Sequence, residues 1–209
     1  MHARPCLGKH RKQATSIIQS SLNTSRLKGL RMDELDVMQD VADRLARLDV
    51  PYMLTGSMAM NFYAQPRMTR DIDIVVDIRR DEAGRVAALF EPDYYVSAEE
   101  IQEAVRHRFM FNIIHNESLI KVDFILRKEE PYRRVEFGRR RTVHIGRVEV
   151  SIVSKEDLIL SKLHWARDSH SELQLRDVRN LLATGYDKAY LNHWLRELNL
   201  YTLAEPLLS

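Results

Sequence analysis

Hydrophobic residues recur at steps of three and four from residue 35 onward, a spacing that predicts an amphipathic helix. The positions in this stripe are Leu35, Met38, Val41, Ala42, Leu45 and Leu48. Asp33 and Glu34 favour its N-terminus through the helix dipole. Pro51 ends it, because the residue before a proline avoids the α region. A short apolar run over 52–55 then predicts a strand, and a short helix is expected over 58–64.

Polar and β-branched residues alternate from residue 71 onward, which predicts a strand over 71–78. Ser97 and Glu100 predict a capping box at the start of a helix that ends near Arg106. The remaining elements expected in this part are a helix over 81–90, hairpin strands over 109–115 and 119–126, and a strand over 148–152 that follows a basic stretch over 133–147.

Beyond residue 153 the pattern is helical throughout. Ser154, followed by acidic residues in the first turn, begins an amphipathic helix that ends near Arg167. Two more helical patterns follow over 173–183 and 188–198. The expected fold class is α+β, a mixed β-sheet with flanking helices and a C-terminal helical portion. The expected parts are a basic, disordered head over 1–31, a core over 32–153 and a helical portion over 154–209.

The composition fits one globular core and excludes several protein classes. Of the 209 residues, 44% are hydrophobic and 30% are charged, which is ordinary for a globular chain. No apolar run reaches the length of about 18 residues that a membrane span needs. The single cysteine, Cys6, excludes an internal disulfide framework and a cysteine-based zinc site. It suits a reducing compartment, and we expect a cytoplasmic protein.

Basic residues are concentrated in the first 31 positions, which hold seven Lys or Arg and no acid. The rest of the chain then carries 25 basic against 30 acidic residues, so the core is not a globally basic nucleic-acid binder. The basic head has three interpretations: a disordered arm, a segment upstream of a true start at Met32, or an organellar transit peptide.

Asp71 and Asp73 form the most informative pair in the sequence. In a strand, residues i and i+2 project from the same face, so these carboxylates are expected roughly 7 Å apart. Such neighbours repel each other unless a cation lies between them. Hard oxygen ligands at this spacing suit Mg²⁺ or Mn²⁺, with substrate phosphate oxygens completing the coordination. Ile72 and Ile74 are expected to face the core.

Gly56 and Ser57 lie at the predicted corner between strand and helix, with thirteen residues between Ser57 and Asp71. A glycine lets the backbone approach a ligand closely. Ser57 is expected as the N-cap, and the free N–H groups of the first helical turn attract anions. We therefore expect this corner to hold the β- and γ-phosphates of a nucleotide.

Asp123 is a third acid, flanked by Val122 and Phe124 in a predicted strand. If this strand lies beside that of Asp71 and Asp73, Asp123 completes a two-metal site or deprotonates an acceptor hydroxyl. Taken singly, each of these motifs is also typical of a solvated strand face or a plain turn. Their joint occurrence in this order predicts one catalytic site.

Several arginines lie outside the expected helices. Arg67 and Arg70 precede the acid pair in an expected loop, where guanidinium groups either clamp a triphosphate or form a structural ion pair. The basic stretch contains Arg133, Arg134, Arg139, Arg140, Arg141 and Arg147. These arginines either attract an RNA acceptor or an acidic partner, or form a solvated face. The eight histidines show no metal-ligand spacing.

Together the motifs resemble the nucleotidyltransferase superfamily with the DNA polymerase β-like fold. Its signature is a Gly followed by Gly or Ser, a spacer, an apolar-flanked Asp-x-Asp or Asp-x-Glu, and a later acid in a strand. The matching segments are Thr55-Gly56-Ser57, Asp71-Ile72-Asp73-Ile74 and Val122-Asp123-Phe124, with the spacer at the long end. Stretches 52–59 and 66–70 are similar to bacterial minimal and AbiEii-like nucleotidyltransferases, many of them linked to toxin–antitoxin systems. The resemblance covers roughly residues 35–185.

The resemblance also implies roles for two residues in the C-terminal helices. Lys162 is implied to contact nucleotide phosphates, with an ordinary solvated lysine as the alternative. Asp177, which follows Arg176, is implied near the active centre, with a helix-surface acid as the alternative.

The function that the resemblance implies is Mg²⁺-dependent transfer of a nucleoside monophosphate from an NTP to an acceptor. The acceptor would be an RNA such as tRNA, a protein or a small molecule, and a cognate antitoxin would be a partner. Two alternatives remain open. One is an interaction or regulatory protein with a vestigial site, and the other is an antibiotic-modifying nucleotidyltransferase.

Overall fold

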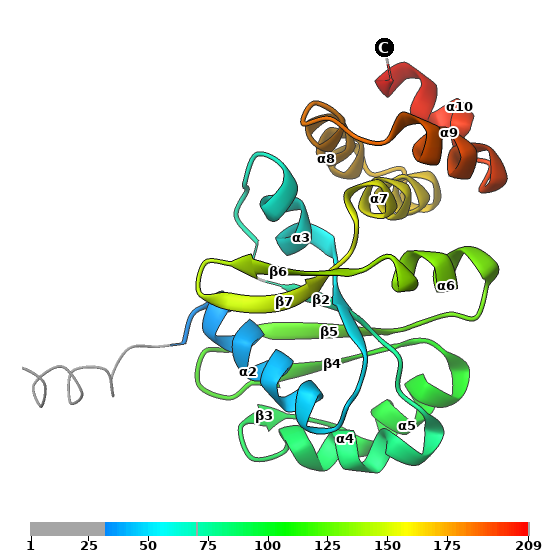
Figure 1. The fold of residues 1–209 in the computed structure, drawn as a ribbon. Coiled ribbons are helices and arrows are strands. Elements are labelled where there is room, and N and C mark those ends of the chain that lie inside the picture. The colour runs from blue at the N-terminus through cyan, green and yellow to red at the C-terminus, as the bar shows by residue number, and fades with distance from the viewer. Residues whose placement is uncertain (1–31, 70, 209) are drawn as a thin grey trace, which may run out of the picture. The chain divides into compact units, whose positions relative to one another are not determined.

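A mixed β-sheet is the centre of the computed structural model, which describes residues 32–69 and 71–208 (Figure 1). Within these residues seven strands pair in the order β3-β4-β5-β2-β1-β7-β6. The strands are β1 Tyr52–Leu54, β2 Ile72–Val76, β3 Tyr94–Tyr95, β4 Met110–His115, β5 Lys121–Leu126, β6 Arg141–Ile145 and β7 Val148–Ile152. Strand β2 runs parallel to β5 and antiparallel to β1, while β4 and β6 pair with β5 and β7 as antiparallel hairpins.

Helices surround this sheet. They are α2 Glu34–Arg47, α3 Gly56–Tyr63, α4 Ala83–Phe90, α5 Ala98–His107, α6 Pro131–Gly138, α7 Lys155–Ser169, α8 Glu172–Leu182, α9 Lys188–Glu197 and α10 Tyr201–Ala204, with 3₁₀ turns η2 Arg80–Glu82 and η3 Glu205–Leu207. Helices α7 to α10 follow the last strand and lie together in Figure 1.

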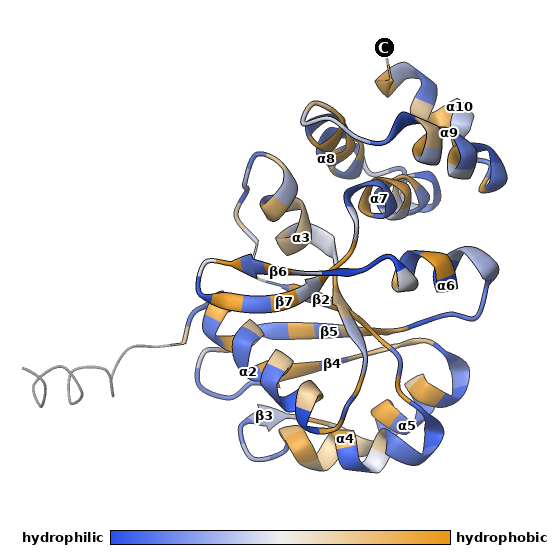
Figure 2. Cartoon of the chain, viewed as in Figure 1, coloured by the Kyte–Doolittle hydropathy of each residue, from blue (hydrophilic) through white to orange (hydrophobic). Residues whose placement is uncertain are grey.

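One face of the sheet forms the hydrophobic core, and helices α2, α4 and α5 cover it (Figure 1). The alternation along β2 buries Ile72, Ile74 and Val76 on this face, as expected from the sequence. Phe90 of α4 packs on Phe124 of β5, with ring centroids 5.7 Å apart. Figure 2 shows the same segregation, with apolar and polar positions alternating along α2 and β7.

The opposite face of the sheet carries the acids of the predicted site. Asp73 and Asp123 are register partners on the parallel strands β2 and β5, so their side chains share this face. Helix α3 packs against β2 and α7, and α8 packs against both α3 and α7. The C-terminal helices therefore border the face on which the acids lie.

The structure confirms most of the predicted elements, adds strand β3, which the sequence did not predict, and corrects four further details. Helix α6 and strand β6 lie within the basic stretch, and α10 follows the last expected helix. Asp71 precedes β2 instead of lying inside it. The N-cap of α3 is Thr55, and Ser57 lies within the first turn of the helix. The expected head over 1–31 lies outside the described residues, and a boundary near residue 153 stays a prediction.

The helices of the described residues are short or amphipathic. Among them, none is long and apolar enough to cross a membrane.

Candidate active site

The corner between β1 and α3 is built around Gly56. Its φ of +63° is in the left-handed region that favours glycine. A Cβ atom at this position would lie 2.6 Å from Cγ of Asp73 and closer still to its Oδ2 atom. The amide of Thr55 donates to the carbonyl of Asp73 at 2.9 Å. The corner therefore holds the backbone directly against the acid, and no other residue fits there without displacing it.

The three predicted acids lie close enough to affect one another. Burial raises the pKa of Asp73, and the charges of Asp123 and Asp71 raise it further. A hydrogen bond from the backbone N–H of Ser57 to the Asp73 carboxylate opposes this shift. The structure thus brings Asp71, Asp73 and Asp123 together beside the first turn of α3, as the sequence predicts.

Asp123 is buried but incompletely satisfied. Its Oδ2 atom lies 2.8 Å from Nζ of Lys121, and this hydrogen bond raises the pKa of the lysine. Its Oδ1 atom is buried and has no hydrogen-bond partner among the described residues. A buried carboxylate oxygen without a donor is unfavourable by about 1–3 kcal/mol or more. This oxygen is a free acceptor position for a cation or a proton.

These acids fit a hard divalent cation that substrate oxygens also bind. The described residues contain no group of three or more His, Cys, Asp or Glu side chains placed to hold a metal ion on their own. Mg²⁺ commonly takes only one or two protein carboxylates together with phosphate oxygens and waters. The unpartnered Oδ1 atom of Asp123 and the mutual repulsion at Asp73 agree with that mode of binding.

Arg67 faces the same corner from the loop after α3. Its Nη2 atom donates to Oγ of Ser57 at 2.6 Å and to Oδ2 of Asp177 at 3.1 Å. Its Nε atom donates to Oδ1 of Asp177 at 3.2 Å. Asn61 fixes the loop, because its side-chain amide exchanges hydrogen bonds of 2.8 and 2.9 Å with the backbone of Arg67. The guanidinium is therefore held beside Ser57.

Lys162 of α7 and Asp177 of α8 complete the cationic side of the site. The ammonium of Lys162 donates to Oδ2 of Asp177 at 2.9 Å and to Gln174 at 3.0 Å. Burial opposes ionisation of Asp177, but hydrogen bonds from Arg67 and Lys162 outweigh it and lower its pKa. Burial lowers the pKa of Lys162, although Asp177 and Asp73 oppose that shift. Both residues implied by the resemblance thus lie at the corner.

The structure places three residues at the site that the sequence did not predict there. It does not describe the position of one residue that the sequence did predict. Asn61 and Gln174 had no sequence signal, because each contributes only by a hydrogen bond that positions another residue, Arg67 in one case and Lys162 in the other. Lys121 could have been found, since it precedes Asp123 by two positions in the same strand. Arg70 lies outside the described residues.

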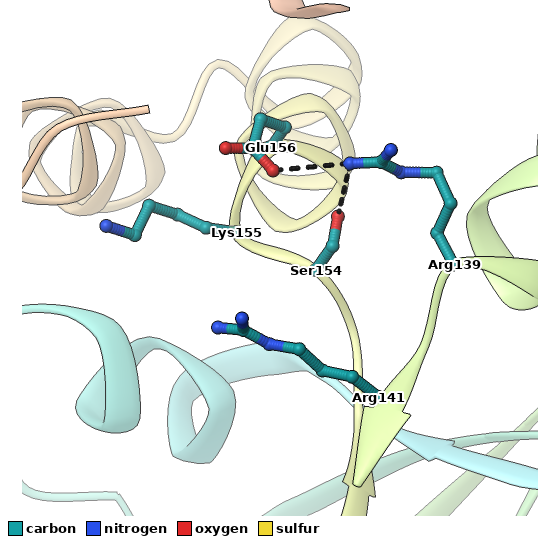
Figure 3. A pocket seen from close by; sticks show the side chains of 5 residues that line it. All are labelled: Arg139, Arg141, Ser154, Lys155 and Glu156. Carbon is teal, nitrogen blue, oxygen red and sulfur yellow. Dashed lines mark hydrogen bonds and ion pairs between the residues drawn. The ribbon is translucent and has the colours of Figure 1, made fainter. Parts of the chain in front are cut away.

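Most arginines of the basic stretch bind side chains or backbone groups of the same chain. Arg139 donates to Asp157 at 3.0 Å and to Glu156 at 3.4 Å, and it lines the cleft in Figure 3 with Arg141 and Lys155. The others have these partners: Arg133 with Glu136, Arg134 with Glu129, Arg140 with the carbonyl of Phe137, Arg141 with the Tyr63 hydroxyl, and Arg147 with Asp36. These arginines therefore have partners within the chain, although four of them, Arg134, Arg139, Arg141 and Arg147, are exposed, as a solvated face would be.

Comparisons with known proteins place this geometry in a known fold. No family model and no curated protein matches the chain. An antigenic nucleotidyltransferase-like protein from Paracoccidioides brasiliensis is similar in structure, with a TM-score of 0.53 and 18% identity over 86% of this chain and 94% of that one. The antibiotic-resistance factor ANT(2'')-Ia gives a TM-score of 0.56 and 14% identity over 83% and 96%. This chain has the nucleotidyltransferase fold. The predicted fold is thereby confirmed, while a closer relation to AbiEii-like proteins stays a prediction.

Proposed function

We propose that this protein is a Mg²⁺-dependent nucleotidyltransferase, which moves a nucleoside monophosphate from an NTP to an acceptor. The observation that carries the proposal is the register pairing of Asp73 with Asp123 beside the Gly56 corner. Buried acids that repel one another and leave an oxygen unpartnered are stabilised by a bound cation. The nucleotidyltransferase fold supports the same reaction.

The triphosphate would bind between α3 and α7. Arg67 offers a planar guanidinium fork to phosphate oxygens, and Lys162 offers a flexible point charge. Backbone N–H groups in the first turn of α3 add a positive end of the helix dipole. Asp177 would act as a positioning residue, because it holds both cations at the corner before the nucleotide arrives.

In the proposed step, an acceptor oxygen forms a new bond to the α-phosphorus of the NTP. The bond between that phosphorus and the oxygen bridging to the β-phosphate breaks, and pyrophosphate leaves with the electron pair. The acceptor proton passes to a carboxylate, for which Asp123 with its free Oδ1 is placed. Asp71 and Asp73 would hold Mg²⁺ or Mn²⁺, which neutralises phosphate charge when bound. A second metal at Asp123 is the alternative role for that residue.

The acceptor class is proposed as RNA (tRNA among them), protein or a small molecule. ANT(2'')-Ia is named as an antibiotic-resistance factor, and its fold likeness over 83% of this chain favours an antibiotic as the small-molecule candidate. The resemblance to AbiEii-like proteins favours a toxin–antitoxin role with a cognate antitoxin as partner. A vestigial site is disfavoured, because Gly56 and all three acids are intact.

The test is incorporation of label from each of the four NTPs, with Mg²⁺ and a cell extract as the source of acceptors. We expect one macromolecule or small molecule to take up label with the wild-type protein. We expect none with the double variant Asp71→Asn/Asp73→Asn. Equal labelling by the folded double variant would overturn the proposal.

A further inference from the structure

A second cleft of about 220 Å³ continues the face on which the acids lie. Its floor contains Val75 and Ile125, which follow Asp73 and Asp123 by two positions on their strands and so share their face. Its wall contains Ser161 and Trp165 of α7. The cleft is smaller than sites that enclose whole drug-sized ligands. Its size suits one ring system at the end of a larger ligand.

Trp165 is unusually exposed for an aromatic residue at the edge of a cleft. Its side chain is 62% exposed, and no ring contact among the described residues involves it. The other tryptophan, Trp194, contacts the rings of Tyr132, Tyr190 and His193. Large aromatic side chains stabilise a fold mainly by burial, and Trp165 instead leaves most of its surface open at the edge of the cleft, where a ligand ring could contact it.

Helix geometry connects Trp165 to the candidate phosphate site. Lys162 and Trp165 are three positions apart on α7, so their side chains are neighbours on the helix surface. Lys162 points to Asp177 beside the Gly56 corner, and Trp165 lines the cleft. A ligand whose phosphates lie at Lys162 would therefore extend its other end along α7 toward the indole.

The polar groups of the cleft match the edge of a planar heterocycle. The hydroxyl of Ser161 donates to Oε1 of Glu136 at 2.6 Å and accepts from Nη1 of Arg133 at 3.0 Å. Arg127 and Lys128 also line the cleft, and Arg127 is paired with Asp77 and Glu129 outside it. A nucleobase has apolar faces and a polar edge, so an apolar floor, an indole and a polar wall are complementary to it.

We propose that Trp165 stacks on the nucleobase of the NTP that binds at the candidate active site. This inference rests on the proposed function and adds the location of the base to it. The base would lie between the indole and the floor formed by Val75 and Ile125, with its edge toward Ser161. Stacking alone recognises any base, so Trp165 would contribute to affinity more than to the choice among NTPs.

Two ligands distinguish base stacking at Trp165 from phosphate binding at the proposed active site. Inorganic tripolyphosphate carries the phosphates without a base, and ATP carries both. Binding of each to the full chain is measured by calorimetry with Mg²⁺ present. For Trp165→Ala we expect ATP to bind about 5- to 150-fold more weakly, the range expected for loss of base–aromatic stacking. Tripolyphosphate should bind this variant as it binds the wild type.

Two matched variants serve as controls. Trp165→Phe keeps a stacking ring, so its ATP affinity should stay within a few-fold of the wild type. Tyr95→Ala removes another exposed aromatic side chain, 66% exposed, on the edge strand β3 and outside the cleft lining, and should change neither affinity. In Trp194→Phe, which leaves Trp165 as the single tryptophan, ATP should quench the fluorescence and tripolyphosphate should not.

The outcomes are distinguishable. If Trp165→Ala binds both ligands as the wild type does, or loses both equally, the stacking proposal is overturned while the active site stands. If Trp165→Ala binds both ligands as the wild type does, the nucleobase does not occupy the cleft, which would then hold the acceptor or no part of the substrates. If neither ligand binds the wild type in a Mg²⁺-dependent manner, the proposed function fails and the stacking proposal fails with it.

Discussion

Asp157 and Asp123 are both buried carboxylates, and their surroundings differ in one respect that separates structure from function. Asp157 is fully buried and accepts hydrogen bonds from Ser154 at 2.6 Å, Tyr190 at 2.6 Å and Arg139 at 3.0 Å, with the Tyr132 hydroxyl at 3.3 Å. Asp123 has one cationic partner and a buried oxygen without any partner in the described residues.

The polar cluster around Asp157 is complete, whereas the one around Asp123 is not. Around Asp157, every donor belongs to the protein, and the carboxylate ties α6, α7 and α9 together. Around Asp123, burial raises the pKa of Asp73, and the charges of Asp123 and Asp71 raise it further. The first cluster stabilises the fold, whereas we propose that a bound cation stabilises the second.

Asp73→Asn should have the largest effect on nucleotidyl transfer, and it tests whether the acids near Asp123 serve catalysis and not stability. Nucleotidyl transfer should fall by about 10³-fold or more, because metal coordination provides several kcal/mol of transition-state stabilisation. The free energy of unfolding should not fall, since the substitution removes one of three repelling charges. Label transfer and thermal unfolding of the same preparation measure both. A large loss of stability would show that Asp73 is structural and contradict the assignment.

Asp157→Ala tests the other buried carboxylate of the comparison, the one with complete hydrogen bonding. Removing this acid leaves Arg139 without its buried partner, so we expect a loss of about 3 kcal/mol in unfolding free energy. For a chain of this size the midpoint of thermal unfolding should fall by roughly 6–12 °C. Transfer per folded molecule should change little. If stability were unaffected and transfer abolished, Asp157 would belong to the catalytic site and would not stabilise the fold.

Gly56→Ala tests how closely the corner is fitted to Asp73. The new Cβ atom would displace the carboxylate, and a φ of +63° disfavours alanine by about 1–2 kcal/mol. We expect transfer to fall by about 10²-fold, because misplacing a catalytic group by about 1 Å has an effect of that size. Steady-state transfer rates with each NTP measure this. Wild-type rates would show that the corner tolerates a side chain.

Asp177 combines features of both clusters. It is fully buried, as Asp157 is, but its partners are Arg67 and Lys162, the two cations that we propose bind phosphate. Its pKa is lowered, so its contribution to stability is present above the unfolded value and is lost as pH falls through the folded one. Asp177→Asn should therefore lower the unfolding free energy by about 2 kcal/mol at neutral pH. That difference should shrink only below about pH 4, as denaturant titrations across pH would measure. A difference that vanished near neutral pH would contradict the assignment.

Arg134→Ala gives the smallest effect and serves as a control for the basic stretch. Its side chain is 64% exposed and lies 3.6 Å from Glu129, unlike Arg139, which binds the buried Asp157. Exposed pairs contribute little, so stability should change by no more than about 0.5 kcal/mol. A larger loss in chemical denaturation would mean that its hydrogen bond to the carbonyl of Glu129 stabilises the fold after all.

Local patterns were sufficient for much of the fold. The alternation over 71–78 located β2 and the buried faces of Ile72 and Ile74. The basic stretch concealed α6 and β6, because its arginines bind acids that the sequence places elsewhere, such as Asp157. Short-range periodicity cannot show such long-range pairing.

The same limit applies to the candidate site. The acids and the Gly56 corner could be predicted because each lies in one local motif. The contact of Arg67 with Asp177 joins residues 110 positions apart, and only the register of β2 with β5 places Asp123 opposite Asp73. The sequence did not indicate a binding role for Trp165, because a tryptophan on a helix is more often buried.

The most direct test of the central claim is thermal unfolding of the wild type and the Asp71→Asn/Asp73→Asn variant with ATP and Mg²⁺, added separately and together. We propose that these acids bind a nucleotide through a divalent cation. Ligand at about 100 times its Kd stabilises by about 2.7 kcal/mol, so the wild-type midpoint should rise clearly when both are present. It should not rise in the variant. An equal rise in the folded variant, or a full rise without Mg²⁺, would contradict the account.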